Sequence, residues 1–208
     1  MKRMYLSEPA FLGIILASAE VYRRECYGLL VGRARPGGTR VEGAIAYQTA
    51  ERTFSGVSLC DRPNRVIQDI VNRFSRHKHA YIGEFHSHPD YGGCDGVVGL
   101  TAVDMAGVGP SEIQVVIAIH RRRRHVRWST RRDGTLSGTL GDYHFKIGGY
   151  QVRRAVGGRA GGKGGRLPRA ARLLRVRVLC GYAVRFLNAA ARHARRAPQA
   201  ASDRPDTA

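Results

Sequence analysis

The sequence predicts one α/β domain over residues 1–152, a curved mixed sheet flanked by helices, followed by a basic tail over residues 153–208. Segments with apolar residues at spacings of three and four alternate with short apolar runs, as helices and strands do. The nearly unbroken apolar run from Ile113 to Ile119 is typical of a central strand buried on both faces. The composition then changes sharply near residue 152. A chain of 208 residues can supply one sizeable core and an appendage.

Three segments are predicted to be helical. Residues 9–24 carry an apolar stripe, and Ser7 stands before it as an N-cap. Residues 63–76 repeat the pattern, and Pro63 suits the first turn of a helix. A short third helix begins near Thr101, after a glycine-rich loop. We expect the helices to cover the sheet.

Strands are predicted where short apolar runs end at glycine or proline. The first is followed by Pro36-Gly37-Gly38, which indicates a turn. The predicted strands are residues 26–31, 41–47, 80–88, 113–119, 126–130 and 143–150.

The tail differs from the domain in net charge and in amino-acid composition. Residues 1–150 hold 21 Lys and Arg against 14 Asp and Glu, whereas residues 151–208 hold 14 against 2. The glycine-rich stretch 157–165 is typical of a flexible linker, and residues 171–190 are expected to form a basic amphipathic helix. The tail is therefore expected to be disordered or partly helical. Its abundant Arg, Ala and Gly also raise the hypothesis that residues after about 154 are translated out of frame.

Cysteine usage and the N-terminus bear on the compartment. The four cysteines form no CxxC pair and are too scattered for a disulfide framework, so we expect reduced thiols. The N-terminus lacks the apolar stretch of a signal peptide. No segment approaches the roughly 20 apolar residues that span a membrane. A cytoplasmic protein is the expectation.

The stretch Gly83-Glu84-Phe85-His86-Ser87-His88-Pro89 carries the chemistry. Side chains two apart on a strand share a face and lie about 6 to 7 Å apart, so His86 and His88 can reach one cation. Neutral imidazole is a common zinc ligand. The pair, with a carboxylate downstream, predicts a metal site.

Two carboxylates compete to complete that site. Asp104 lies in the first turn of the predicted helix after Thr101, and Asp95 lies in the loop before it. Thr101 and Asp104 also have the spacing of a capping box, which requires no metal. Two histidines and one carboxylate leave a fourth position for water, the arrangement of a catalytic zinc.

Together with Glu25-Cys26-Tyr27-Gly28-Leu29-Leu30-Val31-Gly32, these motifs resemble the signature of the JAMM (MPN+) family of zinc metallopeptidases, prokaryotic type. That signature joins a glutamate at the start of a Gly-Leu-Leu-x-Gly strand to His-x-His-Pro and then Ser-x-x-Asp. The resemblance covers residues 4–150. Two departures stand out: the loop before Thr101 exceeds the usual spacing, and Thr101 replaces serine.

The resemblance implies a cytidine-deaminase-like fold, one zinc per chain on His86, His88 and Asp104, Glu25 as general base and Thr101 as oxyanion donor. Glu84 is the competing base, because it shares the strand face of His86. The implied activity is hydrolysis of a peptide or isopeptide bond. The family's usual substrates are linkages at the C-termini of ubiquitin-like proteins and, in prokaryotes, of small sulfur-carrier proteins.

Two other functions remain open from the sequence. The first is a non-catalytic MPN scaffold or binding module. The second is a nucleic-acid-associated protein that binds phosphates through its basic tail, although no stacking motif or reading module is evident. The basic run from His120 to His125 is interpreted as a solvated hairpin turn, with a contact to phosphate or to an acidic substrate as the alternative. The oligomeric state is not predicted.

Overall fold

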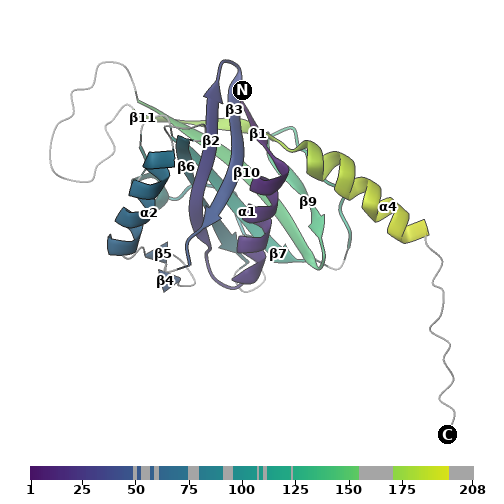
Figure 1. Ribbon diagram of the computed structural model, residues 1–208. Helices are drawn as coiled ribbons and strands as arrows, with labels where there is room; N and C mark the ends of the chain where they lie inside the picture. The colour runs from purple at the N-terminus through teal and green to yellow at the C-terminus, as the bar shows by residue number, and fades with distance from the viewer. Residues whose placement is uncertain are drawn as a thin grey trace, which may run out of the picture.

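The computed structural model describes residues 1–48, 51–52, 57–58, 61–74, 80–90, 96–106, 108–109, 112–122, 124–154 and 171–196. Figure 1 shows how the elements are arranged. The helices are α1 (Glu8–Glu20), α2 (Asp61–Phe74), α3 (Ala102–Ala106), a π-helical segment Tyr182–Leu187 and α4 (Asn188–Arg196). The strands are β1 (Arg3–Leu6), β2 (Tyr27–Arg35), β3 (Gly38–Ala46), β4 (Glu51–Arg52), β5 (Val57–Ser58), β6 (Ala80–Pro89), β7 (Ile113–Arg121), β8 (Ser129–Thr130), β9 (Leu136–Leu140), β10 (Tyr143–Arg154) and β11 (Ala171–Leu179).

One sheet holds nine of the strands, in the order β11-β1-β3-β2-β6-β7-β10-β9-β8. An additional pairing of β11 with β10 closes seven of these strands into a ring. The chain is therefore mostly β with few, short helices, and the predicted α/β fold, a curved sheet flanked by helices as in the cytidine-deaminase-like JAMM fold, is wrong. The ring closes because β11 fits between β1 and β10.

The C-terminal region corrects the predicted boundary at residue 152. β11 pairs in parallel with β1 and antiparallel with β10. Val176 and Val178 are buried in the main core, since their side chains alternate with exposed arginines along the strand. The helix expected over residues 171–190 is thus a strand in its first half. The buried valines also argue against out-of-frame translation of this segment.

Helix α1 follows the sequence pattern closely. Ser7 is its N-cap, as predicted, and its hydroxyl accepts a hydrogen bond from the Ala10 amide at 3.3 Å. Phe11 and Ile15 are buried in the main core, and Phe11 packs edge-on against Trp128 with ring centroids 5.0 Å apart. The helix packs mainly against β3 (Figure 1). Leu16, within the predicted apolar stripe of residues 9–24, is instead 64% exposed.

The two faces of the central strands have different surroundings. On β6, Phe85 belongs to the main core, so Glu84, His86 and His88 point to the opposite face. That opposite face on β2 carries Leu29, which packs in a second cluster with Tyr47 and with Val71 of α2. The histidines therefore lie on the face away from the main core.

Gly83 allows β6 and β7 to approach closely where their pairing begins. Its φ is +150°, and a Cβ atom there would collide with the backbone of Ile113. The β2 partner strand shifts register nearby, between Leu30 and Val31. This irregularity directly precedes the histidines.

Several strands differ from the prediction. β1 and β9 were not predicted, and the strand expected over residues 126–130 is reduced to Ser129–Thr130. The predicted central position of residues 113–119 is confirmed, since β7 lies between β6 and β10 and is almost wholly buried. In the described part of the chain, no helix is long and apolar enough to cross a membrane.

Candidate metal centre

The strand register sets the position of the two histidines. β6 runs parallel to β7, which places His86 beside Val116 and His88 beside Ala118. β10 continues the first row with Gly148 beside Val116. The floor next to the histidines is therefore built from small or apolar side chains.

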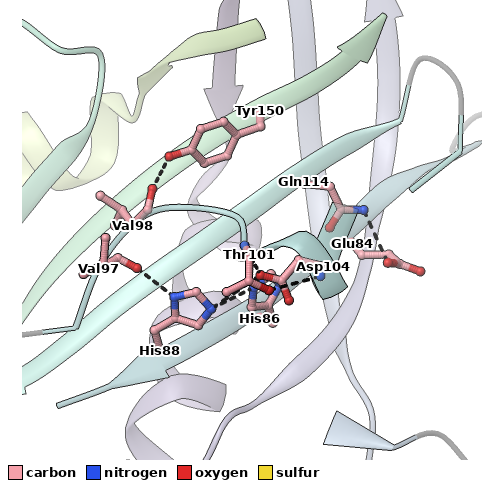
Figure 2. Close-up of polar contacts among 9 residues, drawn as sticks. All are labelled: Glu84, His86, His88, Val97, Val98, Thr101, Asp104, Gln114 and Tyr150. Atoms are coloured by element: carbon pink, nitrogen blue, oxygen red, sulfur yellow. Dashed lines mark hydrogen bonds and ion pairs between the residues drawn. The ribbon is translucent and has the colours of Figure 1, made fainter. Parts of the chain in front are cut away.

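The structure brings His86, His88 and Asp104 together into a group that could hold a metal ion. The Nε2 atoms of His86 and His88 are 3.2 Å apart (Figure 2). Asp104 Oδ2 lies 3.6 Å from Nε2 of His86 and 3.9 Å from Nε2 of His88. The histidines are buried and Asp104 is partly buried. Three donor atoms thus converge from a strand and from the first turn of α3.

The tautomer of His88 follows from its hydrogen bond. His88 Nδ1 lies 2.7 Å from the carbonyl oxygen of Val97, which can only accept, so Nδ1 carries the proton. Nε2 then has a lone pair directed at Asp104 and His86. A metal-binding histidine typically donates its other N–H to such a carbonyl, which fixes the ring orientation.

Asp104 is held by the start of its own helix. Its Oδ2 accepts the Thr101 amide N–H at 2.6 Å, and its amide donates to Thr101 Oγ1 at 3.2 Å. This is the reciprocal pattern of a capping box. The capping interpretation and the metal interpretation therefore apply to the same carboxylate.

The protonation states suit a cation. Burial lowers the pKa of His88 by more than its hydrogen bond to Val97 raises it. Burial alone would raise the pKa of Asp104, but the interaction with His86 and the hydrogen bonds from Thr101 outweigh it and lower that pKa. Near neutral pH the group therefore combines a neutral imidazole at His88 with an ionised carboxylate, the forms in which both residues bind metals.

The donor spacing fits a small tetrahedral ion. Ligand bonds of about 2.0 to 2.1 Å place neighbouring donor atoms about 3.3 Å apart in a tetrahedral zinc site. The three separations described above, 3.2, 3.6 and 3.9 Å, are close to that value. Two imidazole nitrogens and one carboxylate oxygen are also ligands that zinc accepts.

Glu25 lies just before β2, next to a residue that is hydrogen-bonded to β6. The next residue, Cys26, is held against Ser87 by two hydrogen bonds, of 3.1 and 2.9 Å. Cys26 packs in the main core, and Glu25, the residue before it, is half-buried just ahead of β2. Glu25 is not one of the three residues in the metal-binding group.

Glu84, the competing base, has structural partners. Its carboxylate accepts hydrogen bonds from the Tyr81 hydroxyl and from Gln114 Nε2, both at 3.3 Å. In Figure 2 it points toward Gln114 and away from the histidines. Asp95, the competing ligand, lies outside the described residues.

A second histidine pair was not recognised from the sequence. His120 of β7 and His144 of β10 are cross-strand neighbours whose ring centroids are 4.8 Å apart, and both are buried. Ser137 Oγ lies 3.0 Å from His144 Nε2. His120 was interpreted as the start of a solvated turn. Alternation along β7, with His120 on the face of Gln114, was the signal that could have placed it.

Comparison with protein-family models and with curated protein sequences finds no match. Among solved structures, the chain is similar to the solution structure of protein DSY2949 from Desulfitobacterium hafniense, with a TM-score of 0.53 and 13% sequence identity. The similarity covers 85% of this chain and 92% of that chain. At this level of identity the likeness concerns the fold alone.

Proposed function

We propose that this chain is a zinc-dependent peptidase or isopeptidase. The observation that carries the proposal is the convergence of His86 Nε2, His88 Nε2 and Asp104 Oδ2, with the tautomer of His88 fixed by Val97. The resemblance of the same residues to the JAMM motif supports it. Since the predicted fold is wrong, the proposal rests on the donor set and the motif residues.

Three protein ligands favour a catalytic over a structural zinc, because a fourth position is left for water. When bound, zinc supplies Lewis acidity and makes a nucleophilic water available near neutral pH. Glu25 accepts the proton of the attacking water and later returns it to the leaving amine. The Thr101 hydroxyl, which is exposed at the start of α3, donates to the carbonyl oxygen as negative charge develops there.

The substrate class follows from the same resemblance. Isopeptide and peptide bonds at the C-terminus of a ubiquitin-like or sulfur-carrier protein are the first substrates to examine. The experiment measures cleavage of a panel of isopeptide-linked and Gly-Gly-extended substrates by zinc-loaded full-length protein, with and without a chelator. Chelator-sensitive cleavage supports the proposal. Binding without cleavage, in a protein that retains zinc, would favour a non-catalytic binding module instead.

A further inference from the structure

We infer that Tyr150 is a positioning residue for the metal centre, which holds the Val97-Val98 segment in place and thereby fixes the ring of His88. The inference rests on the metal site of the proposed function but not on its reaction. Tyr150 belongs to β10 and touches none of the three metal-binding residues in the contacts that the structure describes. Its action on the site is therefore indirect.

Two adjacent carbonyl groups link Tyr150 to His88. The Val97 carbonyl accepts the His88 Nδ1–H at 2.7 Å, and the Val98 carbonyl accepts the Tyr150 hydroxyl (Figure 2). Successive carbonyls of one short segment are thus bound from β6 and from β10. A shift of Val98 moves the peptide that carries the acceptor of His88.

Gly148 makes this arrangement sterically possible. A Cβ atom at residue 148 would lie 3.2 Å from Val98 Cβ, 3.3 Å from the Val98 oxygen and 3.4 Å from Tyr150 Cε2. The absent side chain lets the loop and the tyrosine ring share the surface of β10. Gly96, which directly precedes Val97, also lacks a side chain at a close contact. A Cβ atom there would collide with the carbonyl of His88.

The C-terminal strand supports Tyr150 in turn. Arg175 of β11 is the register partner of Tyr150, and its guanidinium lies 5.9 Å from the centre of the tyrosine ring. Tyr150 is only 3% exposed. The segment predicted to be a basic helix of the tail therefore contributes, as β11, to the surroundings of the metal centre.

The test uses Tyr150→Phe, which keeps the ring and removes the hydroxyl, in the full-length chain. Tyr5→Phe is the matched control, since Tyr5 is 41% exposed on β1. Long-range ¹H–¹⁵N spectra of the metal-free proteins report the tautomer of His88. The wild type and Tyr5→Phe are expected to show the Nδ1–H form, and Tyr150→Phe a mixture with the Nε2–H form.

Zinc affinity is the second readout. Loss of a group that orients a metal ligand typically costs about 10- to 100-fold in affinity, so Tyr150→Phe is expected to weaken zinc binding about 10-fold. Gly148→Ala, which displaces Val98 from the sheet side, is expected to act in the same direction.

An unchanged His88 tautomer in Tyr150→Phe, with zinc affinity within about twofold of wild type, would overturn the inference. A wild-type His88 that is mainly Nε2–H would overturn it as well. Because the tautomer is measured without metal, a wild type that binds no zinc would refute the proposed function and still leave this inference tested.

Discussion

The Thr101 amide donates to Asp104 Oδ2 at 2.6 Å, and the same carboxylate oxygen lies 3.6 Å from Nε2 of His86. One oxygen atom thus joins the start of α3 to the candidate metal site. The Thr101 hydroxyl in turn accepts the Asp104 amide at 3.2 Å, and a hydrogen bond between the Thr101 side chain and the Asp104 carboxylate helps to lower the pKa of Asp104. Helix capping and the proposed catalysis therefore depend on the same hydroxyl group of Thr101.

Substitution of Thr101 tests both contributions, the catalytic one through kcat and the capping one through the free energy of unfolding. Thr101→Val removes the capping oxygen and the proposed oxyanion donor, and is expected to lower kcat by about 10²- to 10³-fold. It should also lower the free energy of unfolding by about 1 kcal/mol through loss of the cap. Thr101→Ser retains the hydroxyl and should stay near wild type in both. A Thr101→Val enzyme with wild-type kcat would remove Thr101 from the mechanism.

Glu25→Gln tests the proposed general base. The amide cannot accept the proton of water, so turnover should fall by about 10²- to 10⁴-fold while zinc affinity stays near that of wild type. Glu84→Gln is the comparison, because Glu84 is bound to Tyr81 and Gln114 and is expected to retain most activity. Steady-state cleavage rates of the zinc-loaded variants measure both effects. Full loss in Glu84→Gln with normal turnover in Glu25→Gln would reverse the assignment.

The local sequence signals predicted the elements of the site better than the fold. His86 and His88 could be paired because strand periodicity alone places them on one face. Asp104 could be placed because a capping spacing marks the start of a helix. Both signals lie within a few residues of the side chains concerned, and the structure brings all three residues together.

The closure of the sheet could not be read locally. β11 pairs with β1, which lies about 170 residues earlier in the chain, and such a pairing leaves no short-range pattern. In β11 the buried Val176 and Val178 alternate with the exposed Arg175 and Arg177, which is the local pattern of a half-buried strand. The prediction instead fitted the apolar positions of residues 171–190 to a helix and missed this strand. The fold class failed for this reason.

Val178→Asp tests whether the C-terminal strand belongs to the core. Val178 is fully buried, so an unpaired carboxylate there should lower the free energy of unfolding by more than about 3 kcal/mol. Val66→Asp is the matched control, because Val66 is 52% exposed on α2. Urea denaturation followed by circular dichroism measures the difference. Equal, small effects of the two substitutions would show that β11 is dispensable.

His144 gives an expectation for acid stability. Burial, and then the electrostatic interactions with His120 and Arg122, lower the pKa of His144 to about 4. An unfolded histidine titrates near pH 6.5, so the unfolded state binds more protons between about pH 4 and 6.5. The contribution of His144 is therefore full above pH 6.5 and lost as the pH falls toward 4, by up to about 3 kcal/mol.

His144→Gln should flatten this dependence, whatever its effect on stability at neutral pH. The free energy of unfolding, measured by urea denaturation at pH 7 and pH 4.5, gives the slope for each protein. His193→Gln, at an exposed position on α4, should keep the wild-type slope. An unchanged slope in His144→Gln would assign the acid sensitivity to other groups.

Zinc titration of the metal-free, full-length chain by calorimetry tests the central claim most directly. The predicted result is one zinc per chain, with an affinity that falls by at least about 100-fold in Asp104→Asn, more than an outer-shell change produces. Asp142→Asn, at an exposed turn, should bind as wild type does. A wild-type chain that binds no zinc, or an Asp104→Asn variant that binds it equally well, would contradict the assignment of His86, His88 and Asp104 as the metal centre.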